Sequence, residues 1–294
     1  LEAAKLILRG YPIPDTCTIR YLNADFLLYP FQAKYDYIIG NPPFYKLKSS
    51  DDRLAVYRKG AVNQNTTNLC SFFLDKAMQI GNYVAMVFPK FLLNTPEFAV
   101  TRDRLSQKAV DCILDFGEKG FPGVLVETLA VFINNLGRPS RTRVVSVTRG
   151  MEMLQRQNYI FDKKLPYWVI YRDEAFDNVC KKLDFAVFDV FRDRQITNQM
   201  LTEQGEIRVL KARNISDDGT RIEDILHYDS YISKKEAAGL NVYAYLNADD
   251  VYLTPNMTYK PRMMKKPNGC LVNGSVAILL PKDGVCPTDA QMKY

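Results

Sequence analysis

The first half of the chain alternates short apolar runs with segments of helical periodicity, and this pattern limits the possible folds more than any other feature. The apolar runs are continuous rather than alternating, which is typical of strands buried on both faces. The expected strands are 18–22, 35–40, 83–88, 110–116, 128–133 and 143–147, and the expected helices are 1–9, 69–80 and 97–106. The pattern predicts an α/β fold, with a parallel sheet that has helices on both faces.

The second half of the chain has a different character. From about residue 151, charged and aromatic residues mix, and 174–183 has the pattern of a connecting helix. Short β-like pieces then follow at 208–210, 250–253 and 275–280, with turn residues between them. We therefore predict an α/β domain over 1–150, a connector over 151–184 and a mostly β domain over 185–294.

Composition excludes several classes of protein. The 294 residues are 47 % apolar and 24 % charged, which is ordinary for a folded chain of one or two domains. No apolar stretch approaches the roughly 18–20 residues of a membrane span. The six cysteines have no C-x-x-C spacing and there is one histidine, so we expect no metal site and reduced thiols in the cytosol. The net charge of +6 is compatible with a polyanionic partner and favours one only weakly.

The most informative local sequence is Asn41-Pro42-Pro43-Phe44, directly after the strand expected at 35–40. Two prolines fix φ and remove two backbone donors, and a residue before proline is pushed into extended geometry. The turn is therefore rigid, and its carbonyl groups have no local N–H partner. The Asn41 side chain and the Pro42 carbonyl can both accept hydrogen bonds from one exocyclic amine, and Phe44 can stack on the ring that bears it. In an α/β sheet, ligands bind at this edge.

This motif resembles the Asp/Asn/Ser-Pro-Pro-Tyr/Phe motif of the amino-methyltransferases. Together with NADFLL at 23–28 and YDYIIG at 35–40, it resembles the gamma-class N6-adenine DNA methyltransferases of restriction–modification systems, of the Taq type. The resemblance implies a partial doubly wound, Rossmann-like methyltransferase sheet over 1–150. It also implies that 185–294 is a mostly β target-recognition domain.

The resemblance also implies roles for individual residues. The catalytic residues would be Asn41, Pro42, Pro43 and Phe44. S-adenosylmethionine would be the cofactor, contacted by Asp25, Phe26, Asn41 and Pro43, with Asp25 at its adenine amine and Phe26 against its adenine ring. No metal is implied.

A second aromatic residue completes the implied site. The sequence Gly120-Phe121-Pro122-Gly123 before the strand expected at 128–133 resembles the family's late motif. Phe121 would then stack on a flipped-out target base, on the side opposite Phe44. A phenylalanine next to an apolar strand is also common in protein cores, so both interpretations stay open.

The resemblance weakens beyond residue 185, where the segments 209–215 and 259–262 look like parts of the recognition domain. The candidate DNA-binding residues are Lys211, Arg213, Asn214, Lys260 and Arg262. Arg and Asn suit bidentate contacts to base edges, whereas Lys suits phosphate. In the alternative interpretation, Asn214 caps a local turn and the basic residues are an ordinary solvated surface.

The chain also departs from the family. The glycine-rich cofactor loop and the ribose-binding acidic residue, expected before 23–28, do not occur in this sequence. We therefore expect a fragment with a partial cofactor site, inactive and weak in cofactor binding by itself, and with a recognition domain cut short at Tyr294. No E-x-K sequence occurs, so a PD-(D/E)-x-K nuclease centre is not expected in this chain. A fused or partner endonuclease is an open alternative.

The resemblance therefore implies methyl transfer from S-adenosylmethionine to N6 of a flipped-out adenine in double-stranded DNA, by a cytoplasmic prokaryotic restriction–modification protein. Cytosine-N4 methylation uses the same chemistry, although Asn as the first motif residue favours adenine. An RNA or protein methyltransferase is a further alternative. The last alternative is a non-catalytic DNA-specificity fragment of a bifunctional enzyme.

Overall fold

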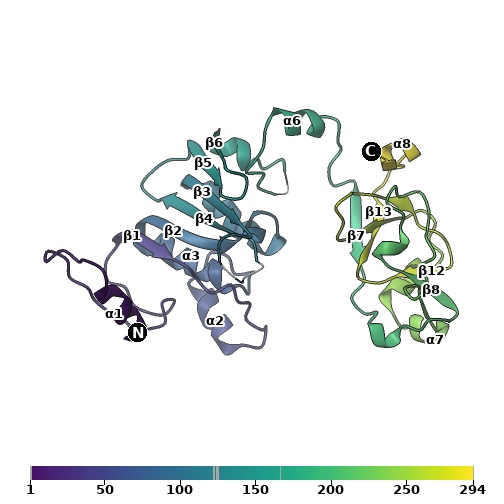
Figure 1. Cartoon of the computed structure of the whole chain (residues 1–294), viewed down its shortest axis with the longest axis horizontal. Coiled ribbons are helices and arrows are strands. Elements are labelled where there is room, and N and C mark those ends of the chain that lie inside the picture. The colour runs from purple at the N-terminus through teal and green to yellow at the C-terminus, as the bar shows by residue number, and fades with distance from the viewer. Residues whose placement is uncertain (1, 122, 124–125, 166, 294) are drawn as a thin grey trace. The chain divides into compact units, whose positions relative to one another are not determined.

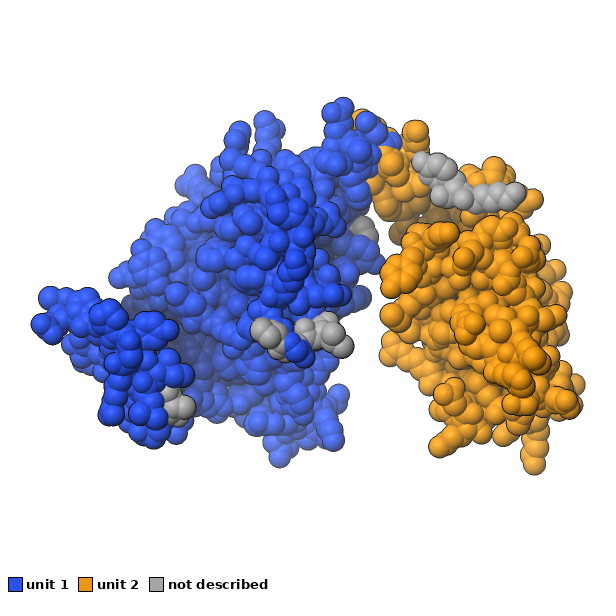
Figure 2. Space-filling view, in the orientation of Figure 1, with its two compact units in different colours: residues 1–178 blue, residues 179–294 orange. Residues whose placement is uncertain are grey.

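The computed structural model describes residues 2–121, 123, 126–165 and 167–293. The chain divides into two compact units, Leu1–Asn178 and Val179–Tyr294 (Figure 2). None of the helices within the described ranges is long and apolar enough to cross a membrane.

The first unit is built on a six-stranded sheet in the order β1-β2-β4-β3-β5-β6 (Figure 1). Its strands are β1 Tyr35–Gly40, β2 Gly81–Pro89, β3 Ala109–Gly117, β4 Thr128–Asn134, β5 Arg141–Ser146 and β6 Met151–Arg156. The pairs β1–β2 and β3–β5 are parallel. The pairs of β4 with β2 and β3, and of β6 with β5, are antiparallel.

The predicted α/β fold is confirmed, whereas the prediction of a parallel sheet is wrong at β4 and β6. A parallel connection needs a crossover of a dozen or more residues, usually a helix. The links 118–127 and 147–150 are shorter than that, so the chain reverses direction in both places. In the second link Gly150 has φ +60°, a conformation that glycine adopts without strain.

The helices agree more closely with the sequence pattern. The described helices that lie wholly in this unit are α1 Glu2–Arg9, α2 Asp52–Lys59, α3 Leu69–Ile80, α4 Ala99–Ser106 and α5 Gln157–Ile160, with 3₁₀ turns η1 Lys90–Leu93 and η2 Pro96–Phe98, and α6 Glu174–Cys180 begins in it. Helix α3 covers the predicted range, and the Asn68 side chain caps it by accepting the Cys70 N–H. The helix predicted at 97–106 is split between η2 and α4.

The strand predicted at 18–22 does not form. Residues 17–23 are coil, and their apolar side chains stay exposed, with Leu22 57 % exposed. A strand needs a neighbour to accept its backbone hydrogen bonds, and no described segment pairs with this one.

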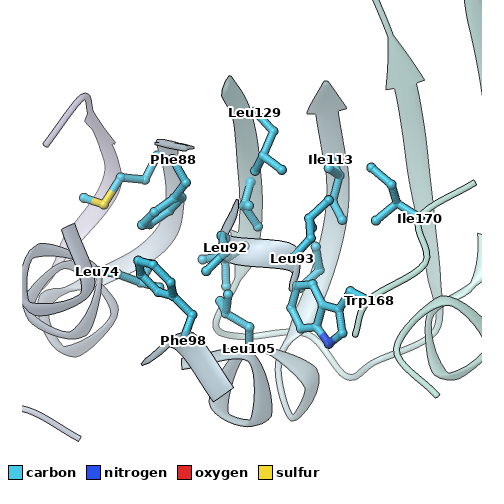
Figure 3. Packing of buried hydrophobic residues seen from close by; sticks show 14 of the residues in the cluster. Leu74, Phe88, Leu92, Leu93, Phe98, Leu105, Ile113, Leu129, Trp168 and Ile170 are labelled. Atoms are coloured by element: carbon cyan, nitrogen blue, oxygen red, sulfur yellow. The ribbon is translucent and has the colours of Figure 1, made fainter. Parts of the chain in front are cut away.

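One face of the sheet carries the core of the first unit. Val84, Met86 and Phe88 of β2 are buried on that face, together with Leu74 of α3 and Leu105 of α4. Figure 3 shows Phe88, Leu92, Phe98 and Trp168 gathered between the strands and the helical segments.

The other face lacks such a cover within the described residues, contrary to the prediction of helices on both faces. Tyr37 and Ile39 of β1 are 74 % and 86 % exposed, and Tyr83 and Phe132 are each 37 % exposed. The register places all four on one face, because Tyr37 pairs with Tyr83, and Ala85 pairs with both Ile39 and Phe132.

The first unit extends beyond the boundary predicted at residue 150. Strand β6 pairs with β5, and Ile160, Trp168 and Ile170 belong to the same core as Phe88. The predicted connector 151–184 therefore contains structural parts of the first unit. Helix α6 forms near the predicted helix and crosses the boundary between the units.

The second unit is mostly β, as predicted. One sheet has the order β11-β10-β13-β7 and the other the order β12-β8-β9. Its elements are β7 Phe188–Arg192, β8 Ile207–Leu210, β9 Ser230–Ile232, β10 Tyr252–Pro255, β11 Met264–Lys265, β12 Cys270–Val272, β13 Val276–Pro281, α7 Lys234–Ala237 and α8 Asp289–Lys293, with 3₁₀ turns η3 Asn198–Met200, η4 Ala212–Asn214 and η5 Asn241–Tyr245. Val209, Leu253, Leu271 and Ile278 share its separate core.

Candidate functional site

The strand register gathers several chain segments at one edge of the first sheet. Gly40 at the end of β1 pairs with Met86, near the end of β2. Pro89, the last residue of β2, pairs with Thr128, and Thr128 also pairs with Gly117 at the end of β3. The turn at Asn41, the segment at Lys90 and the bend at Phe121 therefore all leave the sheet from this edge, where α/β proteins bind their ligands.

The Asn41-Pro42-Pro43-Phe44 turn is anchored by the residues that pack into the core of the first unit. Pro42 is buried and Phe44 is half-buried against the core, while Asn41 and Pro43 are exposed. Immediately afterwards the Tyr45 carbonyl accepts the Leu69 N–H at 2.9 Å, which attaches the turn to the start of α3.

The polar groups of this turn are available to a ligand. Within the described part of the chain, neither the Asn41 amide nor the Pro42 carbonyl has a hydrogen-bond partner. The turn therefore offers two acceptors beside an aromatic ring. This geometry is suited to a planar, ring-bound amine.

The cofactor candidates Asp25 and Phe26 lie on the loop before β1. The Asp25 carboxylate accepts the Leu27 N–H at 2.9 Å and the Tyr57 hydroxyl at 2.6 Å. The hydrogen bond to Asp25 is also the main reason why the pKa of Tyr57 is raised. Phe26 stacks on Phe73 of α3, with ring centroids 5.2 Å apart. Tyr57 was not predicted from the sequence, because its partner is distant along the chain.

Phe26 and Phe44 both pack against the first unit's core. No ring contact joins Phe44 to Phe121 among the described residues. Phe121 is half-buried in the bend after β3, while Pro122 of the same motif lies outside the described residues. The proposed pairing of Phe44 and Phe121 about a base therefore stays a prediction.

A charged cluster that was not predicted lies at the same edge. Asp115 near the end of β3 is 1 % exposed, and its carboxylate lies 3.0 Å from Lys90 Nζ and accepts the Tyr171 hydroxyl. Burial, together with the bond to Asp115, raises the pKa of Tyr171 to about 12. Lys90 and Tyr171 also line a cavity of about 590 Å³, with Arg149 stacked on the Tyr171 ring.

We expect this cluster to make stability fall in alkali. The pKa of Tyr171 is near 10 unfolded and about 12 folded. Protonated Tyr171 therefore stabilises the fold fully below pH 10, and this contribution is lost as the pH rises through 12. Urea unfolding of the wild type and of Tyr171→Phe at about pH 9 and at higher pH should give a difference that shrinks with rising pH. A constant difference would contradict this assignment.

The second unit brings the two predicted DNA-binding segments together. Arg262 donates from Nη2 to the Ala212 carbonyl at 3.4 Å and from Nη1 to Thr258 Oγ1 at 2.7 Å. Its side chain is 11 % exposed and lies 3.7 Å from Asp217. Arg262 therefore joins 258–262 to η4, while Lys260 is exposed.

Lys211 and Arg213 share an aromatic partner. Lys211 Nζ and Arg213 Cζ lie 4.0 Å and 4.8 Å from the centre of the Tyr228 ring. Lys211 also donates to Ser230 Oγ at 2.8 Å, and burial lowers its pKa. Arg213 is exposed, which leaves it free to contact a ligand.

Asn214 is placed differently. Its side chain is fully buried. The amide nitrogen Nδ2 donates to the Glu223 carbonyl at 3.0 Å and to Asp229 Oδ1 at 2.6 Å. The amide oxygen Oδ1 accepts the Lys211 N–H at 2.9 Å. Both amide protons are therefore used internally. This geometry favours the alternative in which Asn214 caps a local turn.

We expect Asn214→Ala to destabilise the second unit by about 1–3 kcal/mol, because buried partners lose their hydrogen bonds. We expect the variant to keep the DNA sequence preference of the wild type, if the wild type has one. Arg213→Ala is the matched variant, since its exposed side chain should cost little stability. Unfolding by circular dichroism and selection on a randomised duplex measure the two properties. An altered preference with unchanged stability would restore Asn214 to the recognition surface.

No group of three or more potential metal-ligating side chains was found where the structure describes the chain. The candidate site consists of the end of β1, the Asn41–Phe44 turn with its unpartnered acceptors, and the nearby Asp25 and Phe26.

The comparisons with known proteins give a family match over part of the chain. Residues 18–121 match the model of the Eco57I restriction-modification methylase family. No curated protein matched the chain. The matched range includes Asp25, Phe26, the Asn41–Phe44 turn and Phe121, but not the second unit.

Three solved structures show similarity at low identity. The type IIG restriction endonuclease BpuSI is 10 % identical with a TM-score of 0.44, over 89 % of this chain and 43 % of that one. A type I restriction-modification methyltransferase subunit from Streptococcus thermophilus is 19 % identical with a TM-score of 0.39, over 60 % and 37 %. The EcoKI M protein is 17 % identical with a TM-score of 0.32, over 49 % and 34 %. This chain spans less than half the length of each of them.

Proposed function

We propose that this chain is part of an S-adenosylmethionine-dependent DNA methyltransferase of a restriction–modification system, acting on N6 of adenine in double-stranded DNA. The observation that carries the proposal is the unpartnered pair of acceptors at Asn41 and Pro42, beside Phe44. The match of 18–121 to the methylase family supports the same reaction class.

The acceptors explain how the turn activates a weak nucleophile. The lone pair of the adenine amine is delocalised into the ring. Hydrogen bonds from its two N–H groups to Asn41 Oδ1 and the Pro42 carbonyl favour a tetrahedral nitrogen, which exists only near the transition state. This is differential binding of the transition state.

When bound, S-adenosylmethionine would supply an electrophilic methyl group. The amine nitrogen would bond to that methyl carbon as the carbon–sulfur bond breaks, and would then lose a proton. Because that nitrogen is strongly acidic, no histidine or other base is needed beforehand. The acceptors at Asn41 and Pro42 hold the amine in line during attack, and such positioning lowers the barrier by several kcal/mol.

The residues of the first unit fit part of this cofactor. Asp25 is exposed, and its carboxylate oxygens retain lone pairs that can accept an amine. Phe26 is half-exposed beside it and offers a ring for an adenine. In this proposal Tyr57 fixes the Asp25 carboxylate through its 2.6 Å hydrogen bond.

The target base must leave the duplex to reach Asn41. Flipping costs a few kcal/mol, and stacking on Phe44 and Phe121 would offset it. In the second unit, Lys211, Arg213 and Lys260 are the proposed DNA contacts, and Arg262 is proposed to hold their two segments together.

Product analysis tests the proposal. The protein that contains this chain is incubated with S-adenosylmethionine carrying a labelled methyl group and duplex DNA, RNA or protein extract. We expect label in DNA, and N6-methyladenine after nuclease digestion and mass spectrometry. N4-methylcytosine would correct the base, whereas label only in RNA or protein would overturn the proposed substrate.

A further inference from the structure

The hairpin between β10 and β11 carries two of the most exposed apolar side chains of the second unit. Met257 is 89 % exposed and Tyr259 is 106 % exposed. We call residues 257–260 the hairpin tip. Single exposed apolar residues are common on protein surfaces, but these two lie two positions apart on one short turn, next to exposed Lys260.

The tip is held in a defined conformation. Thr258 Oγ1 donates to the Lys260 carbonyl at 2.8 Å and accepts bonds from the Lys260 N–H at 3.2 Å and from Arg262 Nη1 at 2.7 Å. Thr254 Oγ1 donates to the Arg262 carbonyl at 2.9 Å, which closes the base of the loop. The exposure of Met257 and Tyr259 is therefore built into the hairpin.

The residues just before β11 pack closely on η4 and on the turn that follows it. Arg262 reaches the Ala212 carbonyl. Gly219, with φ +68°, lies so close that an added Cβ would be 3.0 Å from the Met263 carbonyl. The apolar tip is thus tied to the turn that carries Lys211 and Arg213.

We propose that Met257 and Tyr259 form a wedge that enters the base stack of duplex DNA, while Lys260 binds the adjoining phosphate. This inference rests on the proposed function and adds a role for the second unit. Apolar wedges between base steps unstack and kink a duplex, and aromatic side chains stack on bases. A polyanion also matches the charge of Lys260 in the tip and of exposed Arg213 on η4, the turn that Arg262 bonds to.

The test compares two 30-base-pair duplexes, one fully matched and one with a single central mismatch beside a 2-aminopurine. A mismatch has already lost part of its stacking, so a wedge enters it at lower cost. We expect the full chain to bind the mismatched duplex about 10-fold more tightly, with a change in 2-aminopurine fluorescence.

Two variants separate the wedge from simple charge attraction. Met257→Ser combined with Tyr259→Ser should abolish the mismatch preference and the fluorescence change. Lys260→Ala should weaken binding to both duplexes by the same factor. It should also reduce the slope of log affinity against log salt concentration by about one unit. Leu226→Ser is the matched control, because Leu226 is 86 % exposed elsewhere in this unit. This substitution should change neither the mismatch preference nor the fluorescence response.

A mismatch preference that survives the double substitution would overturn the wedge, as would equal wild-type binding to both duplexes. Tyr259-dependent binding to phosphatidylserine vesicles, without duplex binding, would assign the tip to membranes instead. If the protein transfers methyl groups to DNA but shows no mismatch preference, only the wedge proposal is rejected. A wedge without methyl transfer would remove only the proposed reaction.

Discussion

Replacing Asn41 by alanine should reduce methyl transfer about 10²–10³-fold, because one well-placed acceptor in the transition state is lost. Duplex binding should stay within about twofold, since the Asn41 side chain is directed to the amine in our proposal and the DNA contacts lie elsewhere. Single-turnover methylation of duplex DNA and a separate binding titration measure the two effects.

The control for this prediction is Asn158→Ala. Asn158 is exposed on α5, so its loss should change neither rate nor binding. Asn41→Asp provides a graded variant, because it keeps an acceptor at the same position. Turnover of Asn41→Ala close to that of the wild type would refute the catalytic assignment of the turn.

Replacing Phe88 by alanine should cost about 3–5 kcal/mol of unfolding free energy in the first unit. Phe88 is 0 % exposed and packs in the core on the covered face of the sheet. The substitution removes a large ring and leaves a cavity that rigid neighbours fill only partly. Trp168 is the single tryptophan, 8 % exposed in this same core, so its fluorescence reports the unfolding of this unit alone.

Phe132→Ala is the matched control on the uncovered face. Phe132 is 37 % exposed, so its substitution should cost clearly less unfolding free energy than that of Phe88. Urea unfolding followed by Trp168 fluorescence compares the two variants. Equal costs would contradict the description of a sheet with one covered face.

The strands and helices that were predicted well are those whose signal is local. The runs at β2 and β4 are continuously apolar, β1 is rich in Tyr and Ile and ends at Gly40, and α3 has a capping Asn68 and helical spacing. Such patterns act within one turn or one strand, so they survive whatever packs around them. The segment 18–22 has a similar composition but stays coil, because a strand also needs a partner.

Strand direction and domain limits were less predictable. Whether β4 runs parallel to its neighbours depends on the length of the link before it and on which strands it pairs with in the folded sheet. The limit at residue 150 was placed on a change of composition. The burial of Trp168 and Ile170, however, is decided by contacts with the core formed by β2 and β3.

The candidate site shows the same division. The sequence by itself determined a rigid Asn41-Pro42-Pro43-Phe44 turn after a strand, because the prolines restrict the backbone and remove donors locally. Only the tertiary structure joined Tyr57 to Asp25 and placed Lys90 and Tyr171 around Asp115. It also buried Asn214 against Glu223 and Asp229. The physical reason is that burial and partner choice depend on residues far apart in the chain, which meet only when the fold closes around them.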